Sequence, residues 1–142
     1  MIISVVGKEF PVEVIPMIDA AKKSIEIVVF DWRWYPNDPG SAAQLFNQAI
    51  LRAAKRGVEV KAVTNFTEIC TVLAKSGVIA KKLSEKKLVH VKLMIIDGVY
   101  CILGSHNYTQ NAFSMNYEVS VIFDDLFVIQ RMREFFCNLF FK

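Results

Sequence analysis

Two kinds of hydrophobic pattern alternate along the chain. Residues 25–35 and 58–66 are runs of β-branched and aromatic residues, which are typical of buried strands. Between them, residues 41–57 repeat apolar side chains at helical spacing, begin at Ser41, a common N-cap, and end in basic residues before a glycine. This order predicts a β-α-β unit over residues 25–65, with two parallel strands and a right-handed crossover.

The remaining segments extend the same alternation. We expect a short helix at residues 12–24, a helix interrupted near a glycine at 67–87, a strand at 117–123 and a closing helix at 125–142. No linker, repeat or low-complexity segment divides the 142 residues. The prediction is therefore one α/β domain, with a mixed, largely parallel β-sheet and helices on both faces, an α-β-α sandwich.

Composition and charge narrow the range of partners. The chain is 54% hydrophobic, carries a net charge of +3 and has a pI near 8.8, which favours anionic partners such as nucleic acid or a phospholipid surface. No apolar run approaches the roughly 18 residues of a membrane span, and the N-terminal apolar run is too short for a signal peptide. We expect a soluble, cytoplasmic protein without stable membrane association.

The cysteines do not suggest a redox or zinc site. Cys70, Cys101 and Cys137 are odd in number, widely spaced and without a C-x-x-C pair. We therefore expect reduced and mostly buried thiols.

The apolar segment at residues 90–107 is interrupted by a few polar side chains. Its two apolar runs flank Asp97 and Gly98, a pair that predicts a two-residue type I′ turn and a β-hairpin. Such a turn fixes the register and would place His90 opposite Ser105.

The same register brings further polar groups together. Lys92 would face Leu103, and side-chain alternation would place His90, Lys92, Ser105 and Asn107 on one face, at the end away from the turn. An imidazole, an ammonium, a hydroxyl and an amide without a carboxylate make a poor metal site but suit a phosphate oxyanion. In this interpretation Lys92 and Asn107 hold nonbridging oxygens while His90 attacks or transfers a proton.

A histidine nucleophile also needs a partner that orients its imidazole. Glu118, at the entry to the strand predicted at 117–123, is the candidate carboxylate for the other ring nitrogen of His90. No cofactor or metal is expected at this site.

These residues resemble a known signature. The pattern H-x-K-x4-D-x6-G-S-x-N resembles the HKD motif of the phospholipase D superfamily, and it is filled here by His90, Lys92, Asp97, Gly104, Ser105 and Asn107. The later Asn116–Glu118 is similar to the acidic position that follows this motif in the family. The order of predicted elements also resembles that of the family's domain from residue 12 to the C-terminus.

The resemblance implies a mechanism and an assembly. In this family one histidine forms a covalent phosphohistidine, a second protonates the leaving oxygen, and water releases the product without a metal. The family normally uses two motifs for one active site, whereas this chain has one. The resemblance to the small single-motif bacterial endonucleases therefore implies a homodimer in which two copies of His90 meet. It also implies a structural role for Asp97.

Other chemically notable residues have more than one interpretation. His106 fills the variable position of the motif and should point to the opposite face. Trp32, Arg33 and Trp34 follow the strand predicted at residues 25–35, at the edge where α/β sheets bind ligands, and would stack on bases and pair with phosphate. The alternative is a half-buried strand with both tryptophans on one face.

Two further clusters, one of lysines and one of apolar residues, each have a functional and a structural explanation. A group of lysines before the motif would form a basic rim for a polyanion or only a solvated helix face: Lys81, Lys82, Lys86 and Lys87. The apolar residues of the last helix suggest core or dimer packing rather than membrane contact: Phe127, Phe135, Phe136, Leu139 and Phe140.

The sequence thus predicts a homodimeric, metal-independent phosphodiesterase that cleaves DNA or RNA. A phospholipid hydrolase or phosphatidyl transferase of the same superfamily is the alternative enzyme. A nucleic-acid-binding module with an inactive site is the third interpretation, and the intact motif argues against it.

Overall fold

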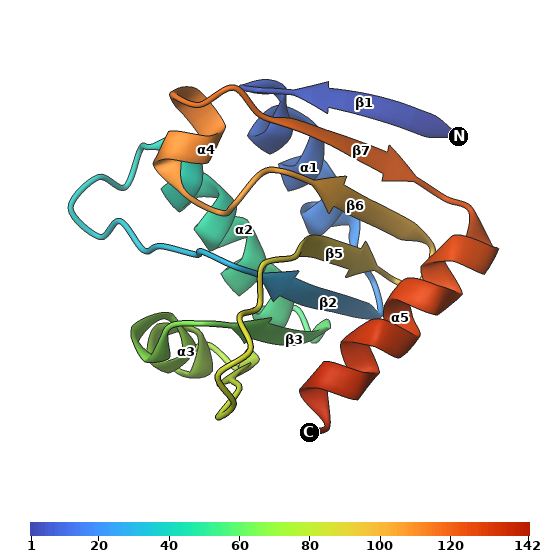
Figure 1. Ribbon diagram of the computed structural model, residues 1–142. Coiled ribbons are helices and arrows are strands. Elements are labelled where there is room, and N and C mark those ends of the chain that lie inside the picture. The colour runs from blue at the N-terminus through green and yellow to red at the C-terminus, as the bar shows by residue number, and fades with distance from the viewer.

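A seven-stranded sheet with helices on both faces makes up the fold, as the computed structural model of residues 1–142 shows (Figure 1). The strands are β1 (Ile2–Val6), β2 (Ser24–Val29), β3 (Glu59–Thr64), β4 (Ile79–Lys82), β5 (Lys92–Ile96), β6 (Tyr100–Gly104) and β7 (Val119–Phe123). The helices are α1 (Glu9–Ala20), α2 (Ala42–Lys55), α3 (Thr67–Ala74), α4 (Gln110–Ser114) and α5 (Leu126–Phe140). The predicted α/β class with two covered faces is confirmed.

The sheet is mixed, with the strand order β1-β7-β6-β5-β2-β3-β4. The predicted β-α-β unit is present, because β2 and β3 pair in parallel and are connected by α2. The expectation of a largely parallel sheet is wrong, since only β2/β3 and β3/β4 are parallel and the other four pairings are antiparallel. The reason is connectivity: β5 and β6 are joined by a tight turn, which leaves no room for a crossover helix.

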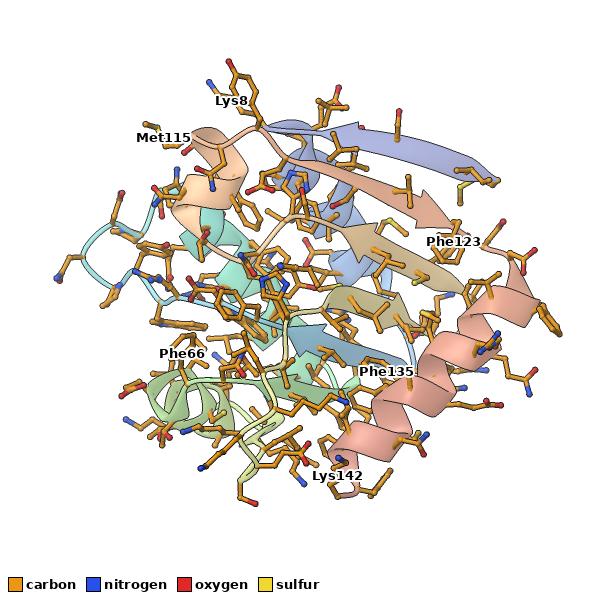
Figure 2. All side chains as sticks on the ribbon, viewed as in Figure 1. Lys8, Phe66, Met115, Phe123, Phe135 and Lys142 are labelled. Carbon is orange, nitrogen blue, oxygen red and sulfur yellow. The ribbon has the colours of Figure 1, made fainter.

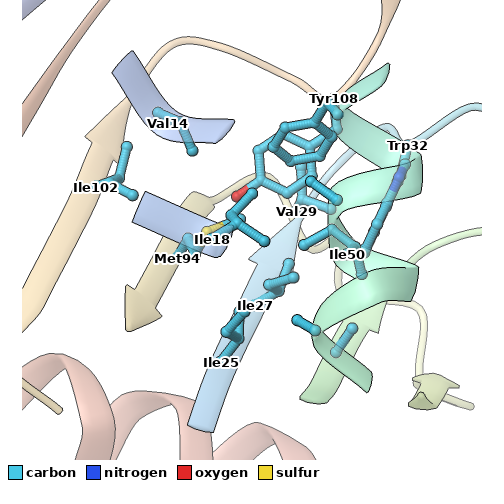
Figure 3. Packing of buried hydrophobic residues seen from close by; sticks show 14 of the residues in the cluster. Val14, Ile18, Ile25, Ile27, Val29, Trp32, Ile50, Met94, Ile102 and Tyr108 are labelled. Atoms are coloured by element: carbon cyan, nitrogen blue, oxygen red, sulfur yellow. The ribbon is translucent and has the colours of Figure 1, made fainter. Parts of the chain in front are cut away.

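Each face of the sheet has its own hydrophobic cluster. Helices α1 and α2 cover the larger cluster, which includes Ile27, Trp32 and Tyr108 (Figure 3). Helix α5 lies across the opposite face, where Phe136 and Phe140 are buried. The predicted core packing of α5 holds for these two residues but not for Phe127, which is 77% exposed. No helix is long and apolar enough to cross a membrane.

Several predicted boundaries differ from the structure. Strand β1, which the sequence analysis did not predict, pairs with β7 at the sheet edge. The helix expected over 67–87 ends at Ala74, because Gly77 at φ +88° turns the chain and Ile79–Lys82 then pairs with β3. The strand expected over 25–35 ends at Val29. In each case the strand pairing in the folded sheet, and not the local sequence pattern, decided where the element begins and ends.

The β5–β6 hairpin has the predicted turn but a different register. Asp97 and Gly98 both have positive φ, +56° and +65°, as a type I′ turn requires. Ile96 nevertheless pairs with Tyr100, so Val99 also belongs to the loop and the register is shifted by one residue. The three cysteines are unpaired, as predicted, but only Cys101 is fully buried.

Candidate active site

The predicted site residues gather at one edge of the sheet. Because β5, β6 and β7 are successively antiparallel, the starts of β5 and β7 lie at the same edge as the end of β6 (Figure 1). His90 and Lys92 are at the start of β5, Ser105 and Asn107 follow β6, and Glu118 precedes β7. The predicted pairing of Lys92 with Leu103 is wrong, because Leu103 faces Leu93. The strand ends bring these residues to one edge, not side-chain alternation.

Backbone contacts fix His90 on both sides. The residue is exposed, and its ring packs against Phe30 with centroids 5.0 Å apart. The Phe30 N–H donates to the Val91 carbonyl at 3.0 Å. The Asn65 amide donates to the carbonyls of Phe30 and Val89, both at 2.8 Å. Asn65 therefore joins the residue before His90 to the end of β2. The only signal for this role in the sequence is a polar residue after a buried strand.

The Lys92 ammonium lies beside His90. Its Nζ donates to the His90 carbonyl at 2.9 Å and is 3.4 Å from His90 Nδ1. It also lies 5.5 Å from the centroid of the Phe30 ring, a favourable distance for a cation–π contact. The positive charge is thus held within reach of an anion that approaches the imidazole.

Asn107 is oriented by the end of β2. Its Oδ1 accepts the Asp31 N–H at 3.1 Å, while the Asp31 carbonyl accepts the Tyr108 N–H at 3.0 Å. With the oxygen engaged, the Nδ2 group has no partner in the chain and is free to donate two hydrogen bonds. This orientation suits the predicted contact with a phosphate oxygen.

Glu118 forms hydrogen bonds with residues of the segments around β6 and β7. Its Oε1 accepts from the Ser105 hydroxyl at 2.6 Å, and its Oε2 accepts from Asn116 Nδ2 at 3.1 Å. Ser105 Oγ also accepts the Val119 N–H at 3.0 Å. No hydrogen bond joins Glu118 to the imidazole of His90 in the single chain, in contrast to the expectation, and the bonds of Glu118 run to Ser105 and Asn116 instead.

Two further motif positions are explained by packing. A Cβ on Gly104 would lie 2.4 Å from the Ser120 Cα, so only glycine allows this approach of β6 to β7. His106, which was expected on the face opposite His90, is buried, with Nδ1 2.7 Å from Ser120 Oγ and Nε2 3.0 Å from the Gly7 carbonyl. Burial lowers the pKa of His106, although the Gly7 contact opposes this effect. His106 therefore stays out of the exposed site.

Asp97 lies at the other end of the hairpin, remote from His90. Its carboxylate accepts the backbone N–H groups of Lys22, Lys23 and Ser24 at 2.7 to 3.1 Å. Burial alone would raise the pKa of this carboxyl, but the three donors outweigh burial and lower it. Asp97 thus joins the hairpin turn to the start of β2.

The aromatic segment after β2 is divided between core and surface. Trp32 is only 2% exposed and donates its Nε1–H to Asn47 Oδ1 at 2.7 Å, so its predicted stacking on a base is wrong. The Asn47 amide also binds the Arg33 carbonyl, which anchors this loop to α2. Arg33 is exposed and pairs with Asp31 at 3.2 Å, while Trp34 is half-buried. Arg33 and Trp34 remain available to a ligand.

The lysines before the motif do not lie on a helix. Lys81 and Lys82 belong to β4, and Lys81 donates to the carbonyls of Phe140 and Lys142 near the C-terminus. Lys86 and Lys87 lie in the exposed segment before His90. No group of three or more histidine, cysteine or acidic side chains is arranged to hold a metal ion.

Comparisons with known proteins show the family and the fold of the chain. A family model described as cardiolipin synthase, PLD-like domain, matches residues 14–140. NucT from Helicobacter pylori has a TM-score of 0.81 at 23% identity, over 98% of this chain and 94% of that chain. Nuc from Salmonella typhimurium, a phospholipase D family member, has a TM-score of 0.80 at 26% identity over the same shares of 98% and 94%.

More distant structures share the fold alone. Phosphatidylserine synthase from Haemophilus influenzae Rd KW20 has a TM-score of 0.75 at 10% identity, over 98% of this chain and 38% of that chain. A search of curated proteins finds no match.

Proposed function

The chain belongs to the family of phospholipase D-like domains, and from this premise we propose that it is a metal-independent phosphodiesterase that cleaves nucleic acid. The observation that supports this most directly is His90, an exposed imidazole fixed by backbone contacts beside the Lys92 ammonium at 3.4 Å. A nucleophile held in place beside a fixed cation is suited to attack on an anionic phosphodiester.

The proposed reaction has two displacement steps. A ring nitrogen of His90 attacks phosphorus, the bond from phosphorus to the leaving oxygen breaks, and a second histidine gives its proton to that oxygen. Water then attacks the phosphohistidine and gives its proton back to the second histidine, which frees His90. Lys92 Nζ and Asn107 Nδ2 stabilise the charge that develops on the nonbridging oxygens.

The second histidine is proposed to come from a second copy of the chain. The other histidine of this chain, His106, is 1% exposed and bonded to Ser120 and Gly7, so it is unsuited to protonate a leaving group. A two-fold axis near the sheet edge would place two copies of His90 in one site. Glu118 would then contribute by holding the Ser105 hydroxyl at the entrance to that site.

A phospholipid substrate is the second candidate. It is favoured only by the description of the matching family and by the fold of a phosphatidylserine synthase. The net charge of +3 suits either anionic substrate. The nucleic-acid substrate is supported by the similarity to the nuclease Nuc, of which this chain covers 94%, whereas it covers 38% of the phosphatidylserine synthase.

One set of assays separates these functions. The protein is incubated in excess EDTA with single-stranded DNA, duplex DNA, RNA and anionic lipid vesicles, and the products are quantified. We expect cleavage of nucleic acid that persists in EDTA, and a denaturing alkaline quench should recover base-stable, acid-labile phosphate on His90. The His90→Ala variant, with the thermal stability of the wild type, should yield neither product.

Two results would contradict the proposal. Strict dependence on a divalent ion, with no phosphohistidine under any quench, would exclude the mechanism while leaving the fold untouched. Full activity of a monomer at high dilution, measured by sedimentation and turnover on the same sample, would exclude the shared site.

A further inference from the structure

A groove of about 340 Å³ lies between the loop after β2 and helix α3. Its apolar walls include Trp34, Phe66 and Val72, and the charged residues Arg33 and Glu68 also line it. Phe66, at the start of α3, is 40% exposed, although a large aromatic side chain gains stability from burial. Figure 2 shows its position beside the loop that follows β2.

Two residues that line the groove, Phe66 and Asp31, are chain neighbours of residues that contact the His90 segment. Phe66 directly follows Asn65, whose amide binds the carbonyl of the residue before His90 at 2.8 Å. On the other wall, Asp31 directly follows Phe30, against which the His90 ring packs at 5.0 Å. From this proximity along the chain we expect the group next to a phosphate at His90 to reach the groove.

We infer that this groove binds one unpaired base of the nucleotide adjacent to the scissile phosphate, an inference that rests on the proposed nuclease function. Phe66 and Trp34 offer aromatic surfaces on which a base stacks regardless of its identity. The acidic Glu68 repels phosphate but accepts hydrogen bonds from the amino group of a base. The phosphate accordingly stays outside, at Lys92, while the base enters the groove.

A lipid acyl chain fits these walls less well. Three of the eight lining residues are charged, namely Asp31, Arg33 and Glu68. An acyl chain would desolvate these groups without pairing them, whereas the edge of a base carries both donors and acceptors.

The test combines a change in the protein with a change in the substrate. Wild type and Phe66→Ala are assayed on a single-stranded oligonucleotide and on copies with one abasic residue placed on either side of the cleaved bond. Loss of one stacked base should lower kcat/KM about tenfold, mainly through KM. The Phe66→Ala variant should show a similar loss on the intact oligonucleotide and no further loss on the abasic one.

Matched variants exclude a general effect on folding. Phe66→Trp should keep wild-type kinetics, and Phe66→Leu, which keeps the apolar volume without an aromatic face, should resemble Phe66→Ala. Val12→Ala, on α1 and 69% exposed in the wild type, should change nothing.

Three outcomes would overturn the inference. If the intact oligonucleotide is cleaved and Phe66→Ala has no effect, the groove does not bind a base and the nuclease proposal stands. If the effects of Phe66→Ala and the abasic residue multiply, the two changes act at separate places. If wild type cleaves only phosphatidylglycerol vesicles, both this inference and the proposed nuclease function fail.

Discussion

Replacing Asp97 by asparagine should destabilise the fold while sparing the chemistry. Asparagine tolerates the φ of +56° at this position and keeps one acceptor oxygen, so the change removes chiefly the negative charge. The charged carboxylate accepts hydrogen bonds from three backbone N–H groups, those of Lys22, Lys23 and Ser24. Hydrogen bonds to a charged group contribute about 1.5–3 kcal/mol each when well buried.

Solvent reduces this contribution at Asp97. The bonds to Lys22 and Lys23 are exposed and only the bond to Ser24 is partly buried, so water screens much of the charge. The asparagine oxygen also replaces part of the interaction. We expect Asp97→Asn to lower the free energy of unfolding by about 1–2 kcal/mol at pH 7, and the melting temperature by about 3–8 °C.

The difference should depend on pH in a defined direction. The folded-state pKa of Asp97 is lowered, so its contribution is complete above the unfolded-state pKa of about 3.9 and is lost as pH falls through the folded-state value. Wild type and Asp97→Asn should therefore converge in stability at strongly acidic pH. Other carboxylates titrate there too, but they are common to both proteins and cancel in the difference.

Urea unfolding of both proteins at a series of pH values measures this difference. Asp38→Asn is the matched control, because the Asp38 side chain is exposed and makes no hydrogen bond. Phosphodiesterase activity of Asp97→Asn below its melting temperature should equal that of wild type. Equal stability at pH 7, or a difference that does not shrink in acid, would refute the role assigned to the carboxylate.

Other residues give predictions of different kinds. Gly104→Ala should destabilise the fold by about 3 kcal/mol or more, seen as a lower urea midpoint, because its Cβ would lie 2.4 Å from the Ser120 Cα. Asn65→Ala should lower kcat about tenfold with little change in KM, since it loosens the segment before the nucleophile. Lys92→Ala and Asn107→Ala should each lower kcat about 10²-fold. Asn107→Ala should also lower the melting temperature, because the Asp31 N–H loses its acceptor. The pH–rate profile of the wild type should be bell-shaped, because two copies of one histidine act in opposite protonation states; a flat profile would oppose the paired site.

The elements predicted from sequence were those with strong local signals. The β-α-β unit over residues 25–65 was found because α2 has a regular apolar face and a Ser41 cap that the structure confirms. The turn at Asp97 and Gly98 was found because few residue pairs adopt positive φ at both positions. Strand β4 was missed, because a short edge strand with two lysines has no pattern that distinguishes it from a helix end.

The sequence by itself determined the chemical groups of the candidate site and their place near the ends of a hairpin, because residue types and a turn signal are local properties. The contacts between those groups were decided by tertiary structure. The amide of Asn65 next to the segment before His90 and the binding of Glu118 to Ser105 join segments that are separated in sequence. The same is true of Trp32, which left the predicted ligand surface because Asn47 in α2 supplies a buried partner for its N–H.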